Sequence, residues 1–218
     1  MDLGRAVRAF FEAAETASAV LAAPAVAQRW ADPSALEGFS VGGLAGHLGV
    51  AGQRLEAALD EPLPGPAVAV ELADFYGVNR VARPDGLNEG FHQFIRDDGE
   101  QRAQQGSDRV AQRFDAVIAR LRARLPNEGP DRLVPVLRVP DGVASLDAYV
   151  ATRVVELVVH TDDLAASVDM PPAPVAPLAA TVAIEVFVEL ARARVGDLEV
   201  IRAFTRREWA RPDALRVL

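Results

Sequence analysis

Five polar side chains form one row in a largely apolar segment at residues 145–168, SLDAYVATRVVELVVHTDDLAASV. They are Tyr149, Arg153, Glu156, His160 and Asp163. Because they follow one another at intervals of three or four residues, they would share one face of an α-helix. The valines and leucine at 154–159 cover most of the remaining circumference, so this helix is predicted to be buried nearly all round. A buried carboxylate costs several kcal/mol unless it is paired or binds a metal ion.

This polar stripe has two chemical interpretations. In the first it is a satisfied core network, with Glu156 paired to Arg153 and His160 hydrogen-bonded to Asp163. In the second, Glu156 and His160 lie one helical turn apart and donate two ligands to one divalent metal ion, as helix-bundle sites often do. The Glu-x3-His spacing alone does not decide between them, since it occurs by chance on many helices.

A third metal ligand would have to come from a facing helix. The chain has no cysteine and three histidines, so any metal must be held by histidine and carboxylate. His47 borders the apolar positions Leu44 and Leu48 of another predicted helix, although a half-buried histidine bonded to a backbone carbonyl would look the same. His92 lies in a glycine-rich segment and is expected to be a loop histidine outside the site.

A site of two histidines and one carboxylate leaves coordination positions open for water or a thiol, which is typical of catalytic metal sites. Asp163, three residues after His160, is a candidate to orient the imidazole. Arg153 is a candidate to pair with Glu156 or Asp163, or to hold the carboxylate of a substrate.

The apolar periodicity predicts the helices that must position these residues. The expected helices span residues 3–21, 41–59, 99–125, 145–168 and 178–195. Ser40 and Ser145 are suited to cap the second and the fourth. Residues 67–97 follow no period, and residues 133–145 are expected to be a short extended connection with a turn at Asp141-Gly142. These elements predict an all-α antiparallel four-helix bundle with a short C-terminal helical extension.

The proline-rich stretch at 170–177 divides the chain into a predicted bundle domain, residues 1–170, and a helical extension, residues 171–218. The extension is too short for a separate core to be expected. Its helix presents an apolar face formed by Val182, Val186 and Leu190. This face would pack on the bundle or on a second subunit, so a homodimer is one alternative.

Composition excludes several classes of function. The 218 residues carry 23 basic and 31 acidic side chains, a net charge of −8, without a basic cluster. This argues against binding to nucleic acid or to an anionic membrane surface. No apolar run reaches the roughly 20 residues that span a bilayer. Glu12 and Glu15 interrupt the stretch where a signal peptide would need its apolar segment, so a cytoplasmic protein is predicted.

Two motifs together resemble a known family. They are W-x2-PSALEGFSVGGLAGHLG, starting at Trp30, and YVATRVVELVVHTDDLA, starting at Tyr149. In this order and separation they resemble the DinB-like superfamily and, within it, the metal-binding domain group of mycothiol-dependent maleylpyruvate isomerase. The resemblance covers about residues 5–168. It implies a divalent metal held by His47, Glu156 and His160.

The resemblance also implies an activity. Relatives use the metal ion to bind and activate a low-molecular-weight thiol, commonly mycothiol, in transferase or isomerase reactions. The expected function is therefore that of a metal- and thiol-dependent transferase or isomerase acting on a small electrophile, with zinc as the first expected metal. The alternatives are a non-catalytic metal-bearing protein that binds or regulates a partner, and a scaffold in which the stripe is a buried salt network.

Overall fold

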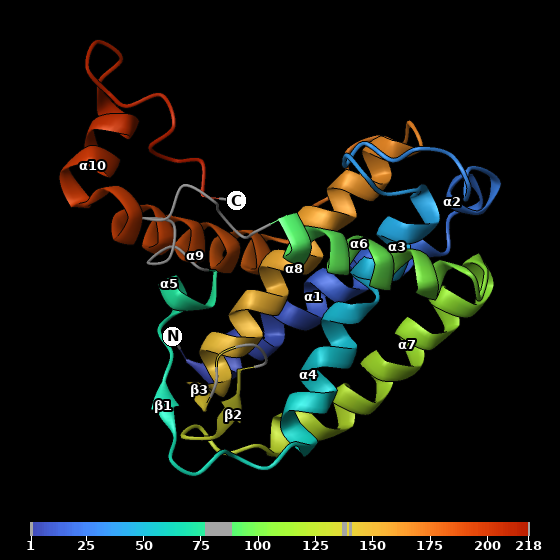
Figure 1. The fold of residues 1–218 in the computed structure, drawn as a ribbon, viewed down its shortest axis with the longest axis horizontal. Helices are drawn as coiled ribbons and strands as arrows, with labels where there is room; N and C mark the ends of the chain where they lie inside the picture. Colours follow the sequence, from blue (N-terminus) through green and yellow to red (C-terminus); the bar gives the residue numbers. More distant parts are fainter. Residues whose placement is uncertain (1, 77–88, 137–138, 140, 218) are drawn as a thin grey trace.

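Helices pack around a common apolar core in the computed structural model, which describes residues 2–76, 89–136, 139 and 141–217 (Figure 1). The long helices are α1 (Leu3–Leu21), α4 (Val50–Asp60), α6 (Glu89–Ala103), α7 (Ser107–Arg124), α8 (Leu146–Ser167) and α9 (Pro177–Val195). The shorter ones are α2 (Pro24–Gln28), α3 (Val41–Leu48), α5 (Leu72–Phe75), α10 (Asp197–Thr205) and a 3₁₀ turn at Leu125–Asn127. The predicted all-α bundle is confirmed.

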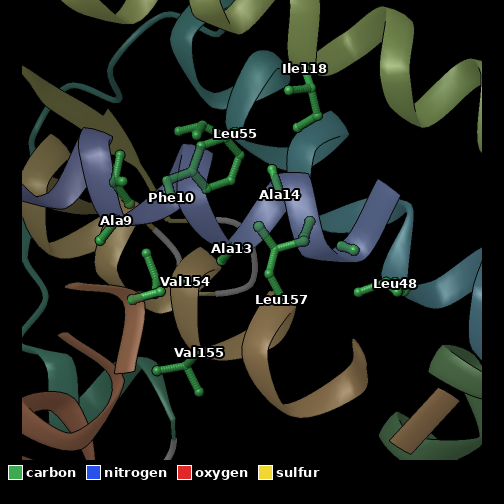
Figure 2. Close-up of a cluster of buried hydrophobic side chains, with 14 of the residues drawn as sticks. Ala9, Phe10, Ala13, Ala14, Leu48, Leu55, Ile118, Val154, Val155 and Leu157 are labelled. Atoms are coloured by element: carbon green, nitrogen blue, oxygen red, sulfur yellow. The ribbon is translucent and has the colours of Figure 1, made fainter. Parts of the chain in front are cut away.

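The central helix, α1, forms because its apolar side chains recur every three or four residues. Asp2 caps its N-terminus by accepting a hydrogen bond from the backbone N–H of Gly4 at 2.9 Å. Its buried face contacts α7, α8 and α9. Figure 2 shows how Phe10 of α1 meets Leu55 of α4, while Ala13 lies beside Leu157 of α8. The core thus fixes α8 between α1 and the helices that carry the other site residues.

Two predicted helices are each divided in the structure. The segment expected as one helix at 41–59 forms α3 and α4, which meet at Gly49. The helix expected at 99–125 is also two helices, because Gly106 adopts a φ of 83° between α6 and α7. Positive φ is readily adopted by glycine, so this residue ends one helix and starts the next. Residues 89–97, expected to be irregular, belong to α6.

A small sheet lies beside the N-terminal end of α8. Its strands are β1 (Val68–Ala69), β2 (Leu133–Pro135) and β3 (Gly142–Ser145), in the order β1-β3-β2. β1 pairs with β3 in parallel, and β2 pairs with β3 antiparallel with Val134 opposite Ala144. The extended connection predicted for 133–145 thus becomes two paired strands. β3 leads directly into α8 and sets where that helix begins.

The C-terminal segment continues the helical fold. On α9, the apolar residues Val182, Val186 and Leu190 are buried, and α9 packs against α1 and α8. The apolar face of α9 was expected to pack either on the bundle or on a second subunit. In the structure it packs on the bundle. α10, which was not predicted, follows α9 and extends away from the bundle (Figure 1). Across the described residues, each helix is too short or too polar to cross a membrane.

Candidate metal centre

α8 supplies two of the predicted ligands because its helical turn brings Glu156 and His160 onto the same face. The residues around them, Val154, Val155 and Leu157, are at most 1% exposed and fix the rotation of the helix. The Glu156 and His160 side chains are 24% and 18% exposed. The face that carries them is therefore half-buried.

The third residue, His47, lies in the last turn of α3. Ser40 begins this helix by accepting a hydrogen bond from the N–H of Gly43, so the predicted cap is present. The carboxylate of Glu100 on α6 accepts hydrogen bonds from the Ser40 backbone N–H and hydroxyl, at 2.7 and 2.9 Å. α3 packs on α8, which directs His47 toward the stripe. The Phe39 ring, 5.7 Å away between centroids, flanks the imidazole.

The three side chains converge on one point. Glu156 Oε2 lies 3.6 Å from His160 Nε2 and 3.8 Å from His47 Nε2. Each residue offers one ligand atom, and the three atoms lie within 4.8 Å of one another. Metal–ligand distances of about 2.1 Å with tetrahedral angles imply separations of roughly 3.4 Å between ligand atoms. The residues therefore fit a divalent ion after side-chain shifts of less than about 1 Å.

Asp163 lies on the far side of His160. Its Oδ2 is 3.0 Å from His160 Nδ1. Because a carboxylate accepts, Nδ1 carries the proton, and Nε2 is the nitrogen that faces Glu156 and His47. A carboxylate on the second nitrogen is the usual means of orienting a metal-binding histidine.

The electrostatics differ between the two imidazoles. Burial acts to lower the pKa of His160, but the hydrogen bonds with Asp163 and Glu156 outweigh it and raise that pKa to about 9. Burial lowers the pKa of His47 to about 4, and the neighbouring charge on His160 acts in the same direction. Without metal at neutral pH, His160 is therefore protonated and His47 is neutral.

Glu156 remains ionised despite its burial. Burial acts to raise the pKa of its carboxyl, but the hydrogen bond from His160 and the charge on Arg153 lower it to about 2. The centre thus holds a carboxylate and a neutral imidazole ready for coordination. The second imidazole must lose one proton first.

Arg153 does not form the ion pair with Glu156 or Asp163 that the core-network interpretation expected. Its guanidinium lies over the rings of Phe75 and Tyr149, 5.3 and 5.4 Å from their centroids. Among the described residues, neither Glu156 nor Asp163 lies within 4.0 Å of the guanidinium. The predicted core network is thus half present: the bond from His160 to Asp163 forms, and the pair between Arg153 and Glu156 does not.

His92 lies in α6 with an exposed side chain, which corrects its assignment to a loop. The group of potential ligands found in the described residues does not include it. Sequence reasoning did not select Phe39, whose ring flanks His47. It also did not select Arg54, whose charge acts with burial to lower the pKa of His47. Phe39 directly precedes the cap of α3, but the sequence carried no signal for Arg54.

Comparison with family models gave one match. The model of the mycothiol maleylpyruvate isomerase N-terminal domain matches residues 11–165, which include His47, Glu156 and His160. Comparison with curated proteins and with solved structures gave no match.

Proposed function

Since the chain belongs to the family of the mycothiol maleylpyruvate isomerase N-terminal domain, we propose that it is a metal- and thiol-dependent transferase or isomerase acting on a small electrophile. His47, Glu156 and His160 would hold the divalent ion, with zinc as the first expectation. Mycothiol or a similar small thiol would be the cosubstrate. The observation that carries this proposal is the convergence of three ligand atoms from two helices within 4.8 Å.

The donor set favours a catalytic centre over a structural one. Structural zinc sites are closed by four protein ligands, whereas catalytic sites keep a position open. Here two nitrogens and one oxygen converge, and their side chains are 13–24% exposed. The position that the protein leaves unfilled would be taken by water or by the thiol.

The bound ion would supply charge that favours the thiolate form of a thiol at neutral pH. The protein's own residues prepare this position. Asp163 holds the His160 imidazole with Nε2 facing inward. Phe39 places an apolar ring against His47. Because the chain contains no cysteine, the thiol must come from a cosubstrate.

A spectroscopic titration tests the proposal. With cobalt in place of the native ion, mycothiol or a simple analogue should produce a sulfur-to-metal charge-transfer band. Glu156→Ala protein should give no such band. A wild-type spectrum that does not change at millimolar thiol would refute thiol activation at this centre.

Turnover separates an enzyme from a binding protein. If the protein is an enzyme, its metal-loaded form should accelerate a reaction of small electrophiles in a test panel. That reaction is either the addition of the thiol to the electrophile or a thiol-dependent isomerisation of the electrophile. Thiol binding without turnover across the panel would favour the non-catalytic alternative of the same fold. Absence of metal from protein purified without chelator would favour the scaffold alternative.

A further inference from the structure

The C-terminal arm, residues 197–211, exposes large apolar side chains. α10, which begins the arm, packs on α9, and Val200 is its one buried residue. Four large apolar side chains of the arm are 57–63% exposed: Leu198, Ile201, Phe204 and Trp209. The first three follow one another at intervals of three residues and therefore share the side of α10 that faces away from α9. Clustered apolar side chains on the surface of a folded protein mark a contact surface.

The end of the arm is also positively charged. Arg206 and Arg207 directly follow α10 and are exposed, and neither forms an ion pair within the described part of the chain. The Arg206 guanidinium donates one hydrogen bond, to the carbonyl of Thr205 at 2.9 Å. Glu208 is the one unpaired carboxylate beside them, so two arginines outweigh it. The exposed surface of the arm is thus apolar along α10 and basic beyond it.

A groove of the opposite charge lies next to α9. This α9 groove has a volume of about 520 Å³ and runs between α9, the start of α8 and the small sheet. Val70, Leu72 and Leu133 contribute apolar lining. Among the described residues no arginine lines it, whereas four carboxylates do: Glu71, Asp147, Glu185 and Glu189. Arg5 pairs with Glu185 at 2.7 Å, but Glu71 and Glu189 are exposed and form no ion pair with any described residue.

The arm and the α9 groove adjoin on one side of the molecule. Figure 1 shows α10, α5 and β1 along its left side, and α9 contacts both α10 and α5. A hollow of about 720 Å³ follows the outer side of α9 to Asp197 at the start of α10, and Ile184 and Val188 line it. Glu185 and Glu189 line both the hollow and the groove. The acidic and apolar surface is therefore continuous from the groove to the arm.

These two surfaces complement each other in polarity and in charge. In its own chain the arm extends away from the bundle (Figure 1), so its exposed side chains leave the groove of the same chain uncovered. Because the two surfaces adjoin, a twofold axis through the outer side of α9 would place each arm on the groove of a second copy. An anionic membrane fits the arm less well, since the carboxylates of the groove would face its headgroups.

We propose that the chain forms a homodimer in which the arm of each copy occupies the α9 groove of the other. The apolar side chains of the arm cover those of the groove, and its two arginines pair with the unpaired carboxylates. A stable dimer draws on about 20–30 residues of each partner, and the fifteen residues of the arm with the twelve that line the groove are of this number. The interface differs from the buried face of α9 and does not depend on the proposed function.

Analytical ultracentrifugation of the full-length chain tests the dimer. Wild type should have a mass of about twice 23.3 kDa at micromolar concentration. Phe204→Glu places a charge in the apolar surface of the arm and should weaken association at least about tenfold. Phe94→Glu makes the same change at a 55% exposed phenylalanine of α6 and is the matched control, which should remain dimeric. A monomeric wild type, or an equal effect of the two substitutions, overturns the inference.

Charge reversal tests which surfaces meet. Arg206→Glu with Arg207→Glu gives the arm the sign of the groove, and Glu71→Arg with Glu189→Arg gives the groove the sign of the arm. Each doubly substituted chain alone should associate at least about tenfold more weakly than wild type, because like charges then face each other. In an equimolar mixture, both contacts of a mixed dimer join opposite charges, so heterodimers should form. Failure of the mixture to associate, or unweakened association of either chain alone, contradicts the exchange of arms.

Two controls complete the test. Far-UV circular dichroism should show wild-type helix content in every variant, because all the substituted side chains are exposed. If Phe204→Glu does not fold, Ile201→Glu places a charge in the same surface and takes its role. Sedimentation with phosphatidylglycerol vesicles examines the other occupant. A monomeric wild type that binds these vesicles, with Phe204→Glu unable to do so, would show that the arm contacts a membrane and that the homodimer is wrong.

Discussion

His160 lies between two carboxylates, with Nε2 toward Glu156 and Nδ1 toward Asp163. This arrangement has opposite effects in the metal-free and metal-bound states. Without metal, both carboxylates stabilise the imidazolium, and a proton occupies the place of the ion. With metal, Asp163 holds the ring in the orientation that coordination needs. The same contacts therefore make proton and metal direct competitors.

Metal binding at neutral pH should release about one proton. The pKa of His160 is raised to about 9, while those of His47 and Glu156 lie near 4 and 2. Between about pH 4 and pH 9, His160 is thus the one ligand that must lose a proton. The apparent association constant should rise about tenfold per pH unit over this range and level off above it. Calorimetry in buffers of different ionisation enthalpy measures the released protons directly, and zero release at pH 7 would contradict His160 as a ligand.

Alanine substitutions should identify the ligand set. Changing His47, Glu156 or His160 to alanine removes one of three ligands, so each variant should retain less than about a tenth of the metal of wild type when measured by elemental analysis. His92→Ala removes an exposed histidine of α6 and is the matched control. Loss of metal in His92→Ala but not in His47→Ala would show that the ligand set is wrong.

At the residue scale, helical periodicity was sufficient to place Glu156 and His160 together, since a spacing of four fixes the face they share. His47 could be proposed because it borders the buried stripe of another helix. The surroundings of Arg153 could not be predicted. They depend on Phe75, whose approach is set by where α5 lies in the fold, and no local pattern encodes that position.

At the element scale, the approach of α3 to α6 controls where His47 lies. A Cβ on Gly46 would come 2.5 Å from the backbone carbonyl of Gly99, and a Cβ on Gly99 would come equally close to the carbonyl of Gly43. Both helices therefore need glycine at their contact. Since backbone atoms cannot move aside as a side-chain end can, a side chain here would push the helices apart.

Gly46→Ala should therefore destabilise the protein and weaken metal binding. Overpacking costs about 1–3 kcal/mol, while alanine gains about 1 kcal/mol over glycine in a helix, so a net loss in the free energy of unfolding is expected. Because His47 is the next residue, its imidazole should move with the backbone. Urea unfolding and a metal titration measure the two effects. Gly129→Ala, where no atom lies within 4 Å of the added Cβ, is the control. Unchanged stability and affinity in Gly46→Ala would show that α3 does not depend on this contact.

The helices were predictable where an apolar stripe repeats over several turns, as in α1 and α8. Their interruptions were not. The stripe at Leu44, Leu48, Ala51 and Leu55 continues across Gly49, so periodicity predicts one helix where the structure has two. The strands contain two to four residues, too few for alternation to be visible. The all-α class nevertheless followed from the stripes, because the sheet is small.

At the scale of the whole molecule, α9 completes the core that α1 and α8 begin. Its residues Ala179, Val182 and Leu190 are fully buried although they follow the proline-rich segment at 170–177. Arg5 of α1 forms two hydrogen bonds with Glu185 of α9, both at 2.7 Å, at the edge of this contact. We therefore propose that residues 171–218 are an extension of the bundle and not a domain of their own.

Truncation tests this proposal. A chain that ends at residue 170 loses the buried face of α9 and exposes the apolar side chains of α1 and α8 that it covers. Burial of a valine or leucine contributes about 1.5–3 kcal/mol, so the free energy of unfolding should fall by several kcal/mol, measured by urea denaturation. A chain that ends at residue 205 is the control, because it retains α9 and α10. Among the described positions beyond residue 205, only Ala214 is buried, so the free energy of unfolding should fall much less in this chain.

If the chain ending at 170 unfolds at the same urea concentration as the full chain, α9 is not part of the core. The bundle of residues 1–170 would then be the complete folding unit, and the metal centre on α8 would be independent of α9.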